Sequence, residues 1–152
     1  MTPGPISQKV VVAKSEIVRE MLAGIRTLPL GSERDFRADP RMVAAGESYL
    51  RRGIEALIDL GRHLLARGFG KLVPECAEVA AELGRRGVLD PAIATRLRVM
   101  ARDRNRLVHF YDEVTPAELY RILSSELADI EEALAGLLSW VAQHPEQVDT
   151  SL

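Results

Sequence analysis

Apolar side chains recur every three or four positions along four long stretches of this chain, and this spacing constrains the fold more than any other feature. Such a repeat places the apolar residues on one face of an α-helix, whereas a half-buried β-strand needs strict alternation. The three valines at 10–12 could alternatively form a strand, but the sequence offers them no partner strand. We therefore predict an all-α protein, an up-and-down bundle of four long helices plus a shorter helix.

Capping residues, prolines and glycines set the expected helix bounds. The predicted helices cover residues 7–28, 39–68, 74–86, 90–111 and 115–143. Asp39 and Thr115 are the expected N-caps, and each precedes a proline, which suits the first helical turn. Residues 33–38 are expected to form a charged loop. The two ends, 1–6 and 144–152, are expected to be short and flexible.

Length and composition indicate a single globular domain spanning 1–152. Hydrophobic residues make up 47% and charged residues 28% of the chain, which is typical of a folded protein rather than a disordered one. The net charge of −2 argues against nucleic-acid binding over the whole surface, so any such contact has to be local. Single Cys76 fits a reducing cytoplasm, and we expect no membrane segment and no signal peptide.

Residues 100–111, M-A-R-D-R-N-R-L-V-H-F-Y, concentrate the side chains that bind phosphate or transfer protons. Arginine is a permanent, planar cation that suits phosphate, and histidine exchanges protons near neutral pH. Without evident metal ligands nearby, this combination suits metal-free cleavage of RNA, in which a base deprotonates the ribose 2′-OH and a cation stabilises the phosphate. The plainer interpretation is a solvated helix end whose basic residues favour the helix dipole.

Arg104 falls on the apolar face of its helix, at a position where packing alone would favour leucine. A charge there is costly unless it is paired or faces a polar cleft, so Arg104 is a functional candidate. Glu47, on the apolar face of the 39–68 helix, is a possible partner; alternatively it lies at an exposed end of that face. Arg104 and His109 would point about 140° apart in an unbroken helix. They converge only if the helix unwinds or a second chain takes part.

The string R-N-R-L-V-H-F-Y at 104–111 resembles the R-x4-H motif of the HEPN superfamily of helical ribonucleases, and within it the HepT-like toxins of HepT/MntA toxin–antitoxin pairs. This resemblance implies a HEPN-like bundle, a homodimer and a metal-independent endoribonuclease without a cofactor. It implies that Arg104 stabilises phosphate charge, His109 acts as general acid and base, and Asn105 orients the histidine or the ribose. Phe110 replaces the acidic residue expected there, which makes the mouth of the site more apolar.

The resemblance also implies partners and a control switch. RNA, either mRNA or tRNA, is the implied substrate, and Arg98, Arg102 and Arg106 of the basic cluster are the expected additional contacts. The implied antitoxin is a minimal nucleotidyltransferase, MntA-like, which attaches AMP to Tyr111. The alternative is a non-catalytic helical module that binds and supports a partner nucleotidyltransferase. The presence of both Arg104 and His109 favours the enzyme.

Four residues outside the motif have simpler interpretations. Asp59 and His63 are four residues apart and are expected to form an ordinary surface pair, since two residues do not make a metal site. Cys76 is expected in the core. Trp140, near the end of the last helix, is a candidate interface residue.

Overall fold

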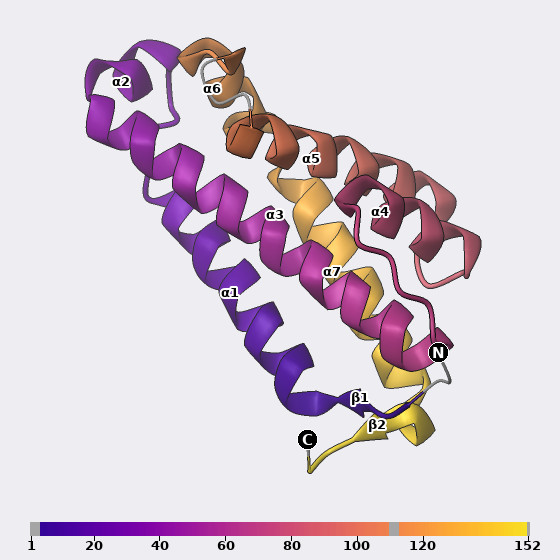
Figure 1. Ribbon diagram of the computed structural model, residues 1–152. Helices are drawn as coiled ribbons and strands as arrows, with labels where there is room; N and C mark the ends of the chain where they lie inside the picture. Colours follow the sequence, from indigo (N-terminus) through magenta and orange to yellow (C-terminus); the bar gives the residue numbers. More distant parts are fainter. Residues whose placement is uncertain (1–3, 110–112, 152) are drawn as a thin grey trace.

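The computed structural model describes residues 4–109 and 113–151, and within them the regular secondary structure is helical apart from one short pair of strands (Figure 1). The helices are α1 (Gln8–Arg26), α2 (Glu33–Ala38), α3 (Pro40–Phe69), α4 (Cys76–Arg85), α5 (Pro91–His109), α6 (Pro116–Ser125) and α7 (Leu127–Gln143). The four longest are α1, α3, α5 and α7, which confirms the predicted all-α bundle. Among the described residues, no helix has the length and apolar character that crossing a membrane requires.

Helix α3 is the element against which the other long helices pack. Its start is the predicted one: Asp39 accepts a hydrogen bond from the Arg41 amide at 2.9 Å, and Pro40 is the first helical residue. It ends at Gly70, which adopts the left-handed conformation with φ 65°. Helix α1 approaches α3 closely because Gly24 has no side chain there; a Cβ would lie 2.7 Å from the ring of Tyr49.

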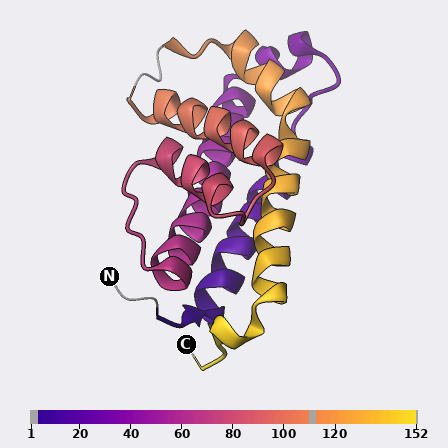
Figure 2. The same ribbon diagram turned by 90° about the vertical axis from the view of Figure 1, so that its right-hand side faces the viewer.

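Helices α4 and α5 pack against each other and lie across one side of α3, with α7 beside α5 (Figure 2). The turn between α4 and α5 passes through Gly87, whose φ of 72° is a conformation that favours glycine. The core between these helices is continuous and aliphatic, and Ile54, Leu57, Leu83, Leu97 and Leu137 are all fully buried in it. Helix α5 is therefore held on its inner face along most of its length.

The helix predicted over 115–143 is divided into α6 and α7 at Glu126. The residues before the break explain it. Ser124 and Ser125 donate side-chain hydrogen bonds to main-chain carbonyls of the preceding turn, those of Tyr120 and Arg121. Such bonds compete with the helical ladder and bend helices. The break lets α6 cross the end of α3 while α7 runs along the bundle.

Two other segments differ from the prediction. Residues 33–38 form the short helix α2 rather than a loop, because Ser32 caps it and the Phe36 side chain is completely buried. The ends were predicted to be flexible, but strand β1 (Ile6–Ser7) pairs in parallel with β2 (Val148–Asp149), after the 3-10 turn Pro145–Gln147. The side chain of Ile6 is fully buried, which fixes this end of the bundle.

Candidate active site on helix α5

Helix α5 carries the predicted motif, and its buried face positions Arg104. Leu97, Met100 and Leu107 are buried along this face, and Arg104 lies among them with 22% of its side chain exposed. The helix continues to His109. Unwinding, one of the two ways in which Arg104 and His109 could converge, is therefore not found before that residue, and their side chains leave one helix about 140° apart.

Two neighbours hold the guanidinium of Arg104. Its Nε and Nη2 donate to Oε1 of Glu55 on α3, at 3.1 and 3.0 Å, and its Nη1 donates to Oδ1 of Asn105 at 3.0 Å. Among the contacts between described residues, these bonds use three of the five N–H donors that a guanidinium carries. The group is thus fixed in orientation and keeps donors for an anion. The suggested role of Asn105, orienting the histidine or the ribose, stays a prediction.

The carboxylate that meets Arg104 is Glu55, and the suggestion of Glu47 as its partner was wrong. Glu47 lies eight residues, or about two helical turns, before Glu55 on α3. It is half-buried and lines a shallow pocket with Val43 and Pro116. The point at which α3 and α5 meet decides the pairing. Glu55 is on the flank of the apolar face, where the sequence gives no signal of burial.

Arg106 is balanced by a carboxylate from α6. Its Nη1 and Nη2 donate to the two oxygens of Glu118, at 2.5 and 2.9 Å. These hydrogen bonds hold the pKa of Glu118 below its usual value. The amide of Glu118 in turn donates to Oγ1 of Thr115 at 3.1 Å, the predicted N-cap. Arg106 therefore ties the end of α5 to the start of α6.

The basic cluster of α5 consists of Arg96, Arg98, Arg102, Arg104 and Arg106, and its other three arginines divide between two sides of the helix. Arg98 and Arg102 are exposed on its outer face, as an RNA contact would require. Arg96 instead faces α7, where its Nε lies 3.2 Å from Asp129 and its Nη2 2.5 Å from Glu132. The basic surface is consequently narrower than the sequence suggested.

The end of the motif is described only in part. His109 is exposed and is the last residue of α5. Phe110 and Tyr111 lie outside the described residues, so the interpretations that concern them, including AMP attachment to Tyr111, stay predictions.

Two partly buried carboxyl groups lie close enough to influence each other: Asp103 on α5 and Glu126 at the break between α6 and α7. Burial raises the pKa of Asp103, and the nearby cation of Arg106 opposes this. Burial also raises the pKa of Glu126, and the negative charge of Asp103 adds to the effect. The cation nearest to Glu126 is Arg121, with Nη1 3.6 Å from Oε1. Both carboxyls are therefore easier to protonate than ordinary surface carboxyls.

The predicted surface pair of Asp59 and His63 was wrong, because each residue has a different partner. Nε2 of His63 accepts a hydrogen bond from the Ser7 amide at 3.0 Å, and burial followed by the charge of Arg67 lowers the pKa of this histidine. Asp59 forms ion pairs with Lys14 at 3.3 Å and with Arg62 at 2.7 Å. The neutral histidine therefore anchors the start of α1.

Trp140 is a core residue of this chain rather than an exposed interface residue. It is buried and packs against Phe69, with ring centroids 5.5 Å apart, and stacks on His144 at 4.2 Å. Cys76 is half-buried against the core. No group of side chains able to hold a metal ion is found in the part of the chain that the structure describes.

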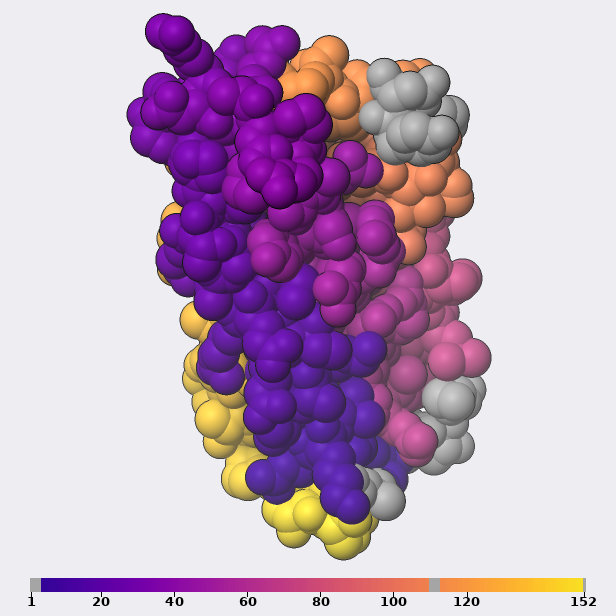
Figure 3. All heavy atoms as spheres, turned by 90° about the vertical axis from the view of Figure 1, so that its left-hand side faces the viewer, coloured from indigo at the N-terminus to yellow at the C-terminus, as the bar shows by residue number. Residues whose placement is uncertain are grey.

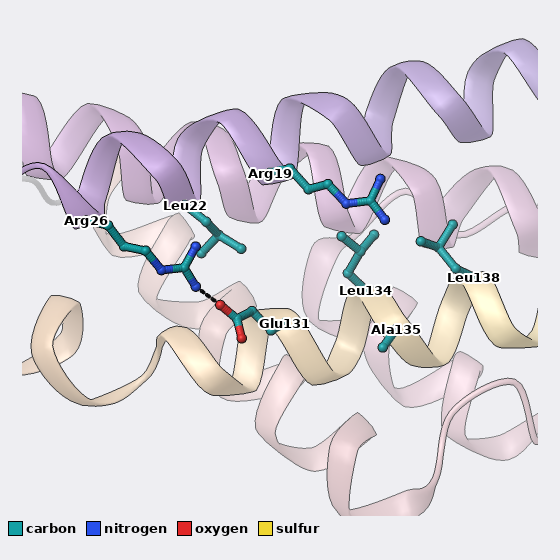
Figure 4. Close-up of a pocket in the computed structure, with 7 residues that line it drawn as sticks. All are labelled: Arg19, Leu22, Arg26, Glu131, Leu134, Ala135 and Leu138. Carbon is teal, nitrogen blue, oxygen red and sulfur yellow. Dashed lines mark ion pairs between the residues drawn. The ribbon is translucent and has the colours of Figure 1, made fainter.

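A separate groove of about 290 Å³ lies between α1 and α7 (Figure 4). Its walls are largely aliphatic, and Arg19 and Arg26 of α1 line its edge. Arg26 forms an ion pair with Glu131 of α7 across the groove. None of the described motif residues, 104–109, lines this groove, which separates it from Arg104 and His109.

The fold and the site together define a class of protein, a helical bundle that carries an arginine and a histidine in the last two turns of one long helix, α5. Within that class the chain belongs to the HepT-like family, described as Ribonuclease HepT-like, whose pattern matches residues 18–137. It is 25% identical over 122 residues to a tRNA nuclease HepT of Aphanizomenon flos-aquae (strain 2012/KM1/D3), covering 80% of this chain and 83% of that protein. The resemblance to HepT-like proteins drawn from the motif is confirmed.

Solved structures agree on the fold. A tri-AMPylated HEPN toxin of Shewanella oneidensis in complex with an MNT antitoxin superposes with a TM-score of 0.77 at 18% identity, covering 86% of this chain and 97% of that one. A toxin–antitoxin structure with AMP-PNP gives a TM-score of 0.75 at 17% identity, covering 84% and 97%. At these identities the likeness establishes the HEPN-like fold.

Proposed function

We propose that this protein is the toxin of a toxin–antitoxin pair and cleaves RNA as a metal-independent endoribonuclease through Arg104 and His109. The observation that carries the proposal is the position of Arg104, on a buried helix face and held by Glu55 and Asn105. A leucine would pack better there, so a chemical role accounts for the charge. The similarity to a tRNA nuclease and to the fold of HEPN toxins supports the same conclusion.

The reaction is an attack of the ribose 2′-oxygen on the adjacent phosphorus. A base removes the 2′-OH proton, the 2′-oxygen bonds to phosphorus, and the bond from phosphorus to the 5′-oxygen of the next nucleotide breaks. An acid gives that leaving oxygen a proton, and the product ends in a cyclic phosphate. His109 serves as the base and the acid, and Arg104 stabilises the charge on the phosphate in the transition state. The substrate is mRNA or tRNA.

A homodimer supplies the second proton-transfer group. One chain offers a single motif histidine, and its side chain points away from Arg104 along a continuous helix. Two copies that pack α5 against α5 about a two-fold axis would bring the Arg104 and His109 of both chains together. The exposure of His109 at the end of α5 supports this arrangement, because a second copy can approach it there. Light scattering at micromolar concentration is expected to give the dimer mass, and a monomer would contradict it.

His109→Ala is the experiment that tests the proposed function. Cleavage of RNA in the presence of a chelator is expected to fall at least about 100-fold, because general acid–base catalysis contributes roughly that much. The melting temperature should stay unchanged, because His109 is exposed at a helix end. The matched control is His144→Ala, which changes a histidine far along the chain from the motif. Wild-type cleavage by the His109→Ala protein would contradict the mechanism.

Control by the antitoxin is the second part of the proposal. A minimal nucleotidyltransferase would attach AMP to the hydroxyl of Tyr111, two residues after His109, and the added phosphate would compete with RNA for the arginines. Tyr111→Phe is expected to keep cleavage and to resist the antitoxin. Intact-mass measurement after coexpression tests this: an AMP-sized increase in the Tyr111→Phe protein, or none in the wild type, would reject Tyr111 as the acceptor.

The alternative function is a non-catalytic helical module that supports a partner nucleotidyltransferase. Such a module would bind the partner and raise its activity, yet cleave no RNA at any concentration. The position of Arg104 favours the nuclease, since a supporting module has no need of a charge on its buried face. A cleavage assay with purified protein separates the two functions.

A further inference from the structure

The carboxylate that pairs with Arg104 also lies near a second arginine. Oε1 of Glu55, which accepts hydrogen bonds from Arg104, also lies 3.7 Å from Nη1 of Arg51, one turn earlier on α3. A single carboxylate oxygen therefore faces two guanidinium groups from two different helices. The three side chains carry a combined charge of +1, so one positive charge stays unbalanced within the triad.

The direction of the two helices places Arg51 towards the His109 end of α5, measured along the helix axes. Helices α3 and α5 run in largely opposite directions where they pack (Figure 1). Residues that precede Glu55 on α3 therefore lie beside residues that follow Arg104 on α5. Arg51 precedes Glu55 by about 6 Å along its helix axis, and His109 follows Arg104 by about 7.5 Å along the other.

Part of the Arg51 side chain reaches the surface at this junction, with 34% of it exposed. Its neighbour Glu55 carries one negative charge and faces two arginines, so it does not neutralise both of them. In Figure 3 the atoms of α3 lie directly beside those of α5 on one face of the molecule.

We infer that Arg51 is a further RNA-binding residue of this site, which contacts the phosphate next to the one that is cleaved; the inference rests on the proposed ribonuclease function. Neighbouring phosphates of an RNA strand are several ångströms apart, a spacing comparable to one helical turn. A strand held at Arg104 therefore carries its next phosphate towards Arg51. The guanidinium of Arg51 offers a fork of donors that matches a phosphate oxygen pair.

The test compares Arg51→Ala with Arg52→Ala in cleavage of a short RNA under steady-state conditions. Arg52 is the matched control, because it is the next residue of the same helix, carries the same charge and is exposed. For Arg51→Ala, the KM is expected to rise about tenfold with kcat changed less than about twofold, since a phosphate contact supports binding more than chemistry. The plot of log(kcat/KM) against the logarithm of the salt concentration has a negative slope, and for Arg51→Ala this slope should be smaller in size by about one.

Two further measurements make each outcome decisive. Arg51→Lys should restore the salt slope, because it restores the charge, and circular dichroism should show wild-type melting for every variant. Equal KM values for Arg51→Ala and Arg52→Ala would overturn the inference. If the wild type cleaves no RNA, the proposed function fails instead. RNA binding by the same proteins, measured by fluorescence anisotropy, then tests Arg51 alone.

Discussion

Two of the arginine–glutamate pairs that join helices in this protein lie in opposite surroundings. Arg26 of α1 and Glu131 of α7 meet over a surface groove, and their side chains are 54% and 48% exposed. Arg104 of α5 and Glu55 of α3 meet among buried aliphatic residues and are 22% and 30% exposed. The residue types are the same, but only the second pair takes a place that packing would give to an apolar side chain.

The difference between the pairs supports the chemical role proposed for Arg104. An exposed ion pair contributes about 0–1 kcal/mol to stability, because water already solvates both charges. A half-buried pair loses more hydration, and an apolar replacement of both partners often keeps or raises stability. Stability therefore does not account for the pair at Arg104. A cation held in a fixed orientation for the proposed contact with phosphate would account for it.

Removal of Arg104 should have the largest effect. In Arg104→Ala the kcat/KM for RNA is expected to fall about 100-fold to 1000-fold, the usual loss when one donor to a developing oxyanion is removed. Replacement of both partners, Arg104→Leu with Glu55→Gln, should be equally inactive yet melt no lower than the wild type, because no unpaired carboxylate stays behind. A double variant that still cleaves RNA would show that the pair does not serve the reaction.

Another ion pair, Arg121 and Glu126, allows a test in which the expected effect on stability is of intermediate size. Oε2 of Glu126 is buried and has no hydrogen-bond partner among the described residues, and burial raises the pKa of this carboxyl. The folded protein therefore favours the protonated form, and stability declines as the pH rises from the ordinary pKa of 4.5 through the raised value. Glu126→Gln keeps the shape without the charge.

Urea unfolding measures the consequence. At about pH 7 the Glu126→Gln protein should be more stable than the wild type by about 1 kcal/mol, the scale of one buried polar group without a partner. Below the ordinary pKa of 4.5 the two proteins should converge, because the wild-type carboxyl is then protonated in both states. A less stable variant at neutral pH would mean that the attraction to Arg121 outweighs the burial.

The exposed pair should respond least. Arg26→Ala and Glu131→Gln are each expected to change the free energy of unfolding by less than about 0.5 kcal/mol and to leave RNA cleavage at the wild-type rate. Thermal melting and the cleavage assay used for Arg104 check this. A loss of cleavage in either variant would mean that the groove between α1 and α7 takes part in the function, and would remove the contrast between the pairs.

The sequence alone determined the class of fold and the helix that carries the candidate site. Apolar spacing depends only on local helical geometry, so it predicted the four long helices, and Asp39 and Thr115 act within their own first turns. The placement of Arg104 on a buried face followed from the same periodicity. Its neighbours in the string, from Asn105 to Tyr111, were enough for the resemblance to the HepT-like family.

The tertiary structure decided which side chains meet across helices. It selected Glu55 rather than Glu47 for Arg104, brought Arg51 to the same carboxylate, and paired Arg106 with Glu118. It also buried Ile6 and Phe36, which no periodic pattern marked. Periodicity fixes the face on which a residue lies, but not the level at which two helices cross. That level depends on the packing of the whole core, and it determines every contact between distant residues.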